Sequence, residues 1–208
     1  MMPGTFITIE GGEGAGKSTI MRRVAAWLDE RGHRVVSTRE PGGTELAEKL
    51  RAILLDRNTV GLAGQAELLL MFAARAQHLA ELIRPALERG ETVLCDRFTD
   101  ATWAYQGGGR GLPREDIATL ERLVHSDLQP DLTLLLDLPV EQGLQRASRR
   151  GAADRFEKES AEFLERVREA YLERAAAAPQ RFVRVDAAGS VEAVWAQVER
   201  ALQERFPA

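Results

Sequence analysis

Residues 11–18 read GGEGAGKS and fit the phosphate-loop pattern G-x-x-x-x-G-K-[ST]. In such a loop, glycines let successive backbone N–H groups converge on phosphate oxygens, and the helix that follows adds partial positive charge. Lys17 would bring a point charge to the β- and γ-phosphates, and Ser18 a hydroxyl ligand for Mg²⁺. A tight glycine turn before a helix is the structural alternative. The pattern predicts a nucleotide-phosphate site made of Gly11, Gly12, Glu13, Gly14, Ala15, Gly16, Lys17, Ser18 and Thr19.

A phosphate loop usually works with a second carboxylate at the end of a strand, near the metal. Asp96 follows the apolar run TVLC, and Asp137 follows TLLL. We favour Asp96 as the metal-site residue, because Arg97 comes directly after it and could handle phosphate at the same strand end. The alternative for each aspartate is a helix cap, and for Asp137 this is the preferred interpretation because a helix is expected from Val140.

Two arginines follow predicted strands. Arg39 lies in TREPGGT after the second strand, and Arg97 follows the third. The carboxyl ends of parallel strands meet at one edge of a sheet, where the phosphate loop also opens. Two guanidinium groups at that edge could clamp a second phosphate beside the nucleotide, which an enzyme with water as its acceptor does not need. The alternative is a pair of solvated surface arginines.

Further side chains in the sequence suit the recognition of a base. Phe72 and Arg75 stand at i and i+3 of a predicted helix, so Phe72 could stack on a base while Arg75 bonds its edge. Phe72 as a core residue is the alternative. Thr102, Tyr105 and Gln106 add a hydroxyl, a phenol and an amide close to Arg97.

A third group of arginines lies in GLQRASRRGAADRFE. Arg146 and Arg150 share a helical face, and Arg155 follows a Gly-Ala-Ala break. Such a segment, at about 146–156, could close over the triphosphate as a lid and neutralise charge as the phosphoryl group moves. The alternative is a solvated helix end, where arginines are favoured.

Apolar, strand-like runs alternate with helical patterns along the chain. Strands are expected at 5–9, 34–37, 92–95, 132–136 and 182–185. Helices are expected at 18–31, 46–55, 65–89 with a kink near Pro85, 113–125, 140–150, 160–178 and 191–206, and a glycine-rich loop at 106–111. This alternation predicts βαβ units, and therefore an α/β fold with a parallel sheet covered by helices on both faces. No linker or repeat interrupts it, so we expect a single domain over 1–208.

The composition excludes several classes of protein. The chain has 208 residues and a net charge of −4, which argues against a nucleic-acid coat or a membrane-surface protein. No apolar stretch is long enough to span a membrane, and the N-terminus lacks the pattern of a signal peptide. The only cysteine, Cys95, excludes an intrachain disulfide and fits a reducing cytoplasm.

Taken together, the motifs closely resemble those of the bacterial thymidylate kinases, which are P-loop nucleoside monophosphate kinases. The resemblance runs nearly end to end, through IEGGEGAGKST, TREPGGT, LLLMFAARAQH, DRF, AYQGGGRG, PDLTLLLDLP and DRFE. It implies phosphoryl transfer from ATP to dTMP with Mg²⁺, a P-loop NTPase fold with a five-stranded parallel sheet, and a homodimer packed through helices. Other nucleoside monophosphate or deoxynucleoside kinases, and a nucleotide-binding module without turnover, are the alternatives.

The resemblance also implies a role for each matching residue. Residues 11–18 would surround the donor phosphates, Arg39 and Arg97 the dTMP phosphate, and Asp96 the metal and its waters. Phe72 would stack on thymine, with Arg75, Thr102 and Gln106 bonding the base. Tyr105 would crowd the sugar C2′ position and disfavour ribonucleotides. Glu13 would contact the 3′-hydroxyl of dTMP.

The chain departs from the family pattern at Gly14, where some relatives carry an arginine. In this subtype the lid supplies that charge, and Arg150, then Arg155, are the expected sources. Thr102 also departs, because many relatives have Asn or Ser at that position. The expected catalytic set is Lys17, Arg97, Arg150, Arg155 and Glu13, with Arg146 on the donor side.

Overall fold

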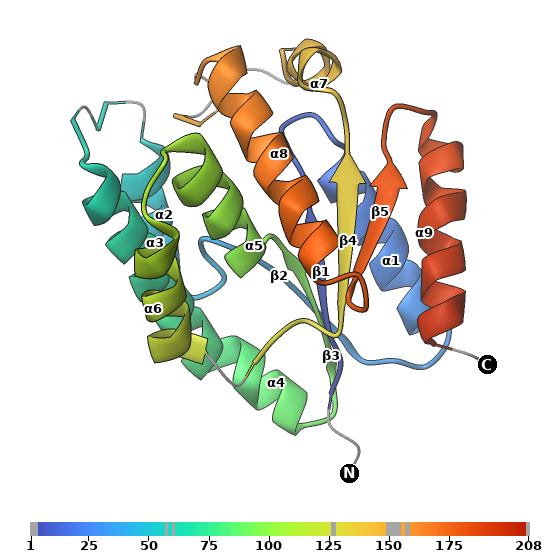
Figure 1. Cartoon of the computed structure of the whole chain (residues 1–208). Coiled ribbons are helices and arrows are strands. Elements are labelled where there is room, and N and C mark those ends of the chain that lie inside the picture. Colours follow the sequence, from blue (N-terminus) through green and yellow to red (C-terminus); the bar gives the residue numbers. More distant parts are fainter. Residues whose placement is uncertain are drawn as a thin grey trace.

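Five strands form one sheet in the computed structural model, which describes residues 4–56, 58–59, 61–125, 128–148, 155–156 and 159–206. All neighbouring strands are parallel, in the order β2-β3-β1-β4-β5 (Figure 1). The strands are β1 (Phe6–Glu10), β2 (Val35–Arg39), β3 (Thr92–Asp96), β4 (Leu132–Asp137) and β5 (Phe182–Asp186). The expected five-stranded parallel sheet is thereby confirmed.

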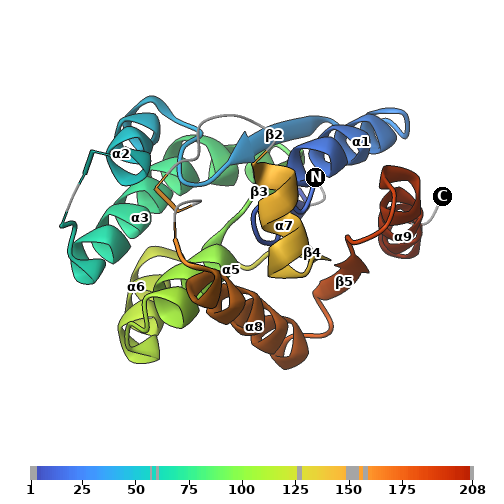
Figure 2. The same cartoon turned by 90° about the horizontal axis from the view of Figure 1, so that it is seen from above.

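Helices connect the strands and cover both faces of the sheet (Figures 1 and 2). They are α1 (Lys17–Asp29), α2 (Glu45–Leu55), α3 (Gly64–His78), η1 (Leu79–Ile83), α4 (Arg84–Glu88), α5 (Thr99–Thr102), η2 (Trp103–Gly109), α6 (Arg114–His125), α7 (Val140–Ala147), α8 (Ala161–Ala177) and α9 (Val191–Arg205). Of the helix expected at 140–150, the described part ends at Ala147, and 149–154 lie outside the described residues.

Alternating side chains of the strands contribute to hydrophobic clusters on the two faces of the sheet. Ile7 and Ile9 of β1 pack with α1 and α9 on one face of the sheet. Phe6, which precedes Ile7 and therefore points to the opposite face, packs with Val93, Cys95 and η1. Both sets are almost fully buried, as expected for parallel strands with helices on both sides. The sheet is therefore packed on both faces, and its carboxyl edge can position side chains of different strands.

The long helix expected at 65–89 is interrupted where Pro85 approaches. A π-helical turn, η1, separates α3 from α4, and Pro85 lies in the first turn of α4. Proline lacks an N–H and its ring clashes with the carbonyl four residues earlier, so the wider turn relieves that clash.

The prediction of a glycine-rich loop at 106–111 is wrong for 106–109, which are helical in η2. The glycines serve close packing rather than flexibility. A Cβ on Gly108 would lie 2.6 Å from that of Ala170, and one on Gly109 would lie 2.5 Å from the ring of Phe163. Helix α8 can therefore approach η2 only because these positions lack side chains.

Within the described part of the chain, no helix has the length and apolar character needed to cross a bilayer.

Candidate active site

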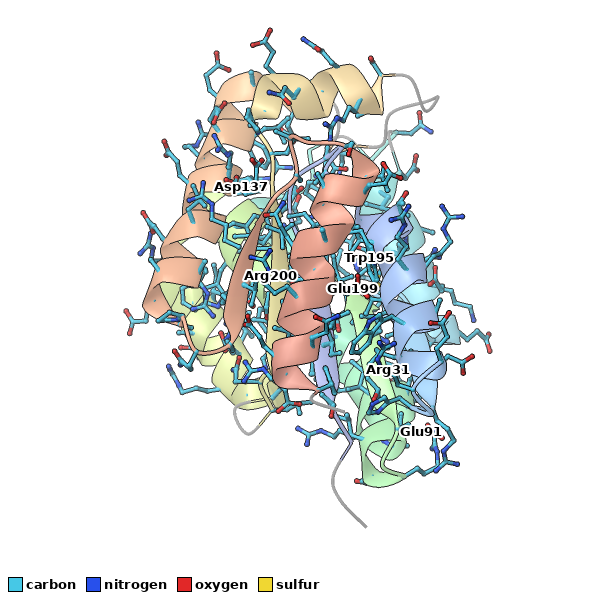
Figure 3. All side chains as sticks on the ribbon, turned by 90° about the vertical axis from the view of Figure 1, so that its right-hand side faces the viewer. Arg31, Glu91, Asp137, Trp195, Glu199 and Arg200 are labelled. Atoms are coloured by element: carbon cyan, nitrogen blue, oxygen red, sulfur yellow. The ribbon has the colours of Figure 1, made fainter. Side chains whose placement is uncertain are left out.

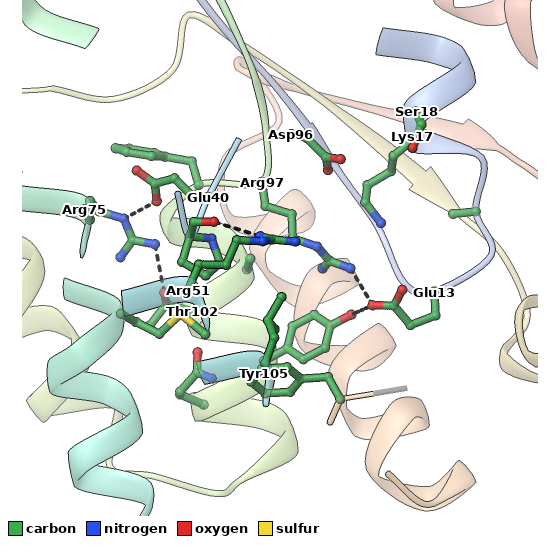
Figure 4. A pocket seen from close by; sticks show the side chains of 18 of the residues that line it. Glu13, Lys17, Ser18, Glu40, Arg51, Arg75, Asp96, Arg97, Thr102 and Tyr105 are labelled. Atoms are coloured by element: carbon green, nitrogen blue, oxygen red, sulfur yellow. Dashed lines mark hydrogen bonds and ion pairs between the residues drawn. The ribbon is translucent and has the colours of Figure 1, made fainter. Parts of the chain in front are cut away.

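A cavity of about 250 Å³ lies at the carboxyl edge of β1 and β3. Its walls come from the phosphate loop, the segment after β2, helices α2 and α3, and the α5–η2 region (Figure 4). The structure brings together twelve of the expected site residues here: Glu13, Gly14, Ala15, Gly16, Lys17, Ser18, Arg75, Asp96, Arg97, Thr102, Tyr105 and Gln106. The Met71, Phe98 and Phe156 side chains also line it, and sequence reasoning had not singled them out.

The phosphate loop holds its lysine against its own backbone. Lys17 is the first residue of α1, and its Nζ donates to the carbonyl oxygens of Gly11 and Gly12, 3.2 Å each. Burial lowers the pKa of Lys17, and nearby Arg97 acts in the same direction, while Glu13 opposes both. The ammonium group is thus oriented into the loop, at the edge of the cavity.

Glu13 forms the link between the loop and the cavity (Figure 4). Its Oε1 accepts from an Arg97 terminal nitrogen at 2.7 Å and from the Tyr105 hydroxyl at 2.9 Å. The Arg97 guanidinium also lies over the Tyr105 ring, 4.7 Å from its centre. A loop carboxylate, a cation from the end of β3 and a phenol from η2 therefore form one cluster, and they constrain each other's orientation.

Arg97 is held in a strained backbone conformation. Its φ is +70°, and no other non-glycine residue in the described ranges has a positive φ. The buried side chains of Tyr171 and Glu10 support this conformation. The Arg97 Nη1 donates to the Tyr171 hydroxyl at 3.1 Å, and that hydroxyl donates to Glu10 at 2.8 Å. Glu10 also accepts from the backbone N–H of Phe98 at 2.7 Å.

Glu10 is fully buried at the end of β1. Burial raises its pKa to about 8, and the charge of Asp100 adds to this effect, although Arg97 opposes it. Sequence reasoning missed Glu10 and Tyr171. A carboxylate closing an apolar strand directly before the phosphate loop was the available signal for Glu10, whereas Tyr171 lies 161 residues away and gave none.

Arg75 is the cation at the opposite wall of the cavity. It is 3% exposed, and its Nε donates to Glu40 at 2.7 Å while Nη2 donates to the Thr102 hydroxyl at 3.0 Å (Figure 4). Nη1 is buried and has no hydrogen-bond partner among the described residues. Glu40 also contacts His78 Nδ1 at 3.0 Å. The guanidinium group is therefore held in one orientation, with one donor nitrogen left without a partner among the described residues.

Phe72, expected to stack on a base, does not belong to the cavity lining. It is 2% exposed and packs with Leu68 and Ile117. The Arg75 guanidinium lies 4.8 Å from the centre of the Phe72 ring, so Phe72 helps to hold Arg75 in place through a cation–π contact.

The two candidate metal-site aspartates have different surroundings. Asp96 lines the cavity, and its Oδ1 is buried with no hydrogen-bond partner in the described chain. Asp137 instead accepts from Arg168 at 2.7 Å and Arg184 at 2.6 Å, beside α8 and β5 (Figure 3). Burial raises the pKa of Asp137, but both arginines outweigh this and hold it below the usual value. The prediction that Asp137 caps α7 is wrong, because the N-cap is Pro139 and no side chain caps this helix.

The residues present fit a magnesium ion that is shared with a nucleotide. Ser18 supplies an exposed hydroxyl and Asp96 an unsatisfied carboxylate oxygen, which are ligand types that Mg²⁺ prefers. No group of three or more His, Cys, Asp or Glu side chains that could hold a metal occurs among the described residues. The remaining ligands would be phosphate oxygens and water, as is usual for this ion.

The comparisons with known proteins all point to one family. The family model described as thymidylate kinase matches residues 9–198. A thymidylate kinase of Pseudomonas putida is 63% identical over 97% of this chain and 96% of its own length. One of Chromohalobacter salexigens is 62% identical over 99% and 98%. The crystal structure of thymidylate kinase from Ehrlichia chaffeensis has a TM-score of 0.80 and 34% identity, over 97% of this chain and all of that one.

The chain belongs to the thymidylate kinase family. Its activity is the phosphorylation of dTMP, a step of nucleotide synthesis. The expected family, enzyme class and fold are confirmed, and the alternative of another kinase or a binding module is not favoured.

Within this thymidylate kinase fold, the departure at Gly14 has a steric reason. Gly14 has a φ of +72°, and a Cβ there would lie 2.2 Å from the carbonyl oxygen of Gly143 in α7. No side chain fits without moving α7, so an arginine at this position of the loop is excluded.

Several expected residues of the kinase site lie outside the cavity. Arg39 is 54% exposed and paired with Glu48 at 2.9 Å, whereas Arg51 of α2 lines the cavity. Arg51 stands four residues before Leu55, another lining residue, and this helical spacing was the overlooked signal. Arg146 donates to the carbonyl oxygens of Ala187 and Ala188, at 2.8 and 3.0 Å.

Of the two arginines expected to act from the lid, the structure describes only Arg155. Arg155 donates to the Leu54 carbonyl oxygen at 2.8 Å and to Glu67 at 2.6 Å, so its described partners belong to α2 and α3 rather than the phosphate loop. Arg150 lies outside the described residues.

Proposed function

We propose that this chain transfers the γ-phosphoryl group of ATP to dTMP, in the presence of Mg²⁺, and releases dTDP and ADP. The observation that carries the proposal is the Glu13–Arg97–Tyr105 cluster, which joins the phosphate loop to the cavity. The loop provides a site for the donor phosphates. The cavity, with Arg97 near the loop and Arg75 at the far wall, provides a site for a nucleoside monophosphate.

The acceptor is a phosphate oxygen that is already ionised at neutral pH, so the reaction needs no strong general base. Rate enhancement then comes from alignment and from neutralising charge. Lys17 would contact the donor phosphates, and Arg97 with Arg51 the acceptor phosphate. Ser18 and Asp96 would hold Mg²⁺, which when bound neutralises charge on the β- and γ-phosphates. Arg150 remains our candidate for the charge absent at Gly14.

The base and sugar would be read by the far half of the cavity. The unpartnered Nη1 of Arg75 is a donor for a thymine carbonyl, and Thr102 fixes that guanidinium. Gln106 adds an amide at the same wall. Tyr105, held by Glu13, would crowd a 2′-hydroxyl group.

A single assay tests this function. The protein is incubated with ATP, Mg²⁺ and one nucleoside monophosphate at a time, and ADP release is followed. We expect release with dTMP. Release only with another monophosphate would reassign the acceptor, and no release with any of them would contradict the kinase function.

Replacing Glu13 with glutamine is expected to lower kcat/KM for dTMP about tenfold, because the amide forms weaker hydrogen bonds with Arg97 and a sugar hydroxyl. ATP binding should change less than twofold, since the loop backbone and Lys17 remain. Steady-state kinetics and ATP titration measure the two effects. A larger loss in ATP affinity than in dTMP turnover would contradict the role of Glu13 as the link between the sites.

We also propose that the chain acts as a single-domain enzyme in the cytoplasm and forms a homodimer. Leu69 of α3 is 57% exposed and Leu123 of α6 is 78% exposed, and these two helices pack together. Large exposed leucines on adjacent helices favour an apolar contact with a second copy.

Leu123→Glu is therefore expected to shift the protein from dimer to monomer in sedimentation velocity experiments, because a charge would be buried in the contact. A wild-type protein that sediments as a monomer at micromolar concentration would contradict the dimer.

A further inference from the structure

Glu67 is a buried carboxylate of α3 that lies behind the cavity wall and is not part of its lining. It is 1% exposed and collects donors from three places in the chain. Gln106 Nε2 donates to Oε1 at 2.7 Å, and Arg155 donates to Oε2 at 2.6 Å. Arg110 donates to both oxygens at 3.3 Å. None of the roles proposed above uses these contacts directly.

The ionisation of Glu67 determines how Gln106 is oriented. Burial raises the pKa of Glu67, but the hydrogen bonds from Gln106, Arg155 and Arg110 outweigh this and hold the pKa below its usual value. An ionised carboxylate accepts hydrogen bonds and donates none. Gln106 must therefore turn its NH₂ group toward Glu67, because the opposite orientation would place its oxygen against a carboxylate oxygen.

The other end of the Gln106 amide is then left for the cavity. Its oxygen accepts no hydrogen bond from the residues that the structure describes, and Gln106 lines the cavity together with Thr102, four residues earlier. Thr102 holds Arg75, whose Nη1 is the unpartnered donor. The cavity lining thus combines an acceptor, the Gln106 oxygen, with a donor group, the Arg75 guanidinium.

A donor and an acceptor in one cavity lining match the edge of thymine or uracil, which carries a carbonyl next to a ring N–H. Cytosine presents an amino donor next to a bare ring nitrogen, so both positions would be mismatched. In a buried site, a polar group that has no partner, or that faces a group of the same kind, costs binding free energy. Such a site therefore discriminates against a mismatched base.

We propose that Glu67 determines specificity indirectly, through Gln106. It fixes the Gln106 amide so that the oxygen faces the base, and thereby selects a thymine or uracil edge over cytosine. This rests on the proposed function, in which the cavity binds the acceptor nucleotide.

The test is Glu67→Gln, assayed with dTMP, dUMP and dCMP as acceptors. A glutamine at position 67 offers both a donor and an acceptor, so Gln106 can flip. We expect the ratio of kcat/KM for dTMP over dCMP to fall about tenfold, since one oriented hydrogen bond is lost. The ratio for dTMP over dUMP should stay unchanged, because the two bases share the same edge. If the substitution only loosened the site, the dTMP/dCMP and dTMP/dUMP ratios would either both change or both stay the same.

Two further variants separate orientation from structural support. Arg110→Gln removes an ion pair of Glu67 but keeps its bond to Gln106, so the dTMP/dCMP ratio should remain that of the wild type. The double variant Glu67→Gln/Gln106→Glu restores a defined pair, with the amide now at 67 and a carboxylate oxygen facing the base. We expect it to recover most of the dTMP/dCMP ratio, and this readout stands even if the single variant folds poorly.

The outcomes are distinct. A wild-type protein that does not phosphorylate dTMP would remove the proposed function itself. A wild-type kinase whose Glu67→Gln variant folds and keeps its dTMP/dCMP ratio would overturn the inference alone. Loss of the ratio in Glu67→Gln without recovery in the double variant would also overturn it, because Glu67 would then act only as structural support.

Discussion

Lys17→Ala is expected to lower kcat with dTMP by about 100- to 1000-fold, the usual effect of removing one oriented donor from developing charge. In the structure the ammonium group is directed by the carbonyl oxygens of Gly11 and Gly12, at the point where the loop meets the cavity. It would act on the donor phosphates, so KM for dTMP should change much less than kcat. Steady-state kinetics at saturating ATP would measure both.

Lys49→Ala is the matched control for this variant. Lys49 is one of the few other lysines, and its Nζ pairs with Glu45 one helical turn away on an exposed face of α2. The Lys49→Ala variant loses the same charge, but away from the phosphate loop, so its kcat should be unchanged. Full turnover in Lys17→Ala, or an equal loss in Lys49→Ala, would contradict a direct role of Lys17 in phosphoryl transfer.

The sequence predicts those parts of the site in which a contiguous motif determines where the side chains lie. The phosphate loop is a contiguous motif between a strand and a helix, and Asp96 and Arg97 directly follow an apolar strand, so their place at the sheet edge follows from topology alone. Arg75 and Thr102 were expected near the base, and both line the cavity. In these cases a few neighbouring residues determine the position of a side chain.

The parts that the sequence does not predict depend on packing between distant elements. Arg39 lies within the TREPGGT segment and Arg51 follows it shortly after, and only the placement of α2 puts Arg51 rather than Arg39 on the cavity. Glu67 contacts residues 39 and 88 positions away, and only the folded chain shows that they share one carboxylate. The glycines at 107–109 predict a loop, and only the packing of α8 against η2 shows why they are needed in a helix.

The second large effect is expected at Arg97. Arg97→Gly should lower kcat/KM for dTMP by about 1000-fold, because the acceptor phosphate would lose a partly buried, doubly hydrogen-bonded guanidinium group. Glu13 and Tyr105 would lose their common partner in the same step. Steady-state kinetics over a wide range of dTMP concentrations would measure the change.

The backbone of Arg97 adds a prediction about stability. At a φ of +70° an ordinary side chain is strained by about 1 kcal/mol, which glycine avoids. Arg97→Ala keeps that strain and Arg97→Gly relieves it, although both remove the same guanidinium group. The two variants should be equally inactive, while the glycine variant has the higher free energy of unfolding by about 1 kcal/mol in urea titrations. If the alanine variant were the more stable one, the conformation at Arg97 would carry no strain. In the proposed site, this backbone strain would be the cost of directing the Arg97 side chain at the acceptor phosphate. Glu10 would maintain the strained conformation through its hydrogen bonds with Phe98 and Tyr171.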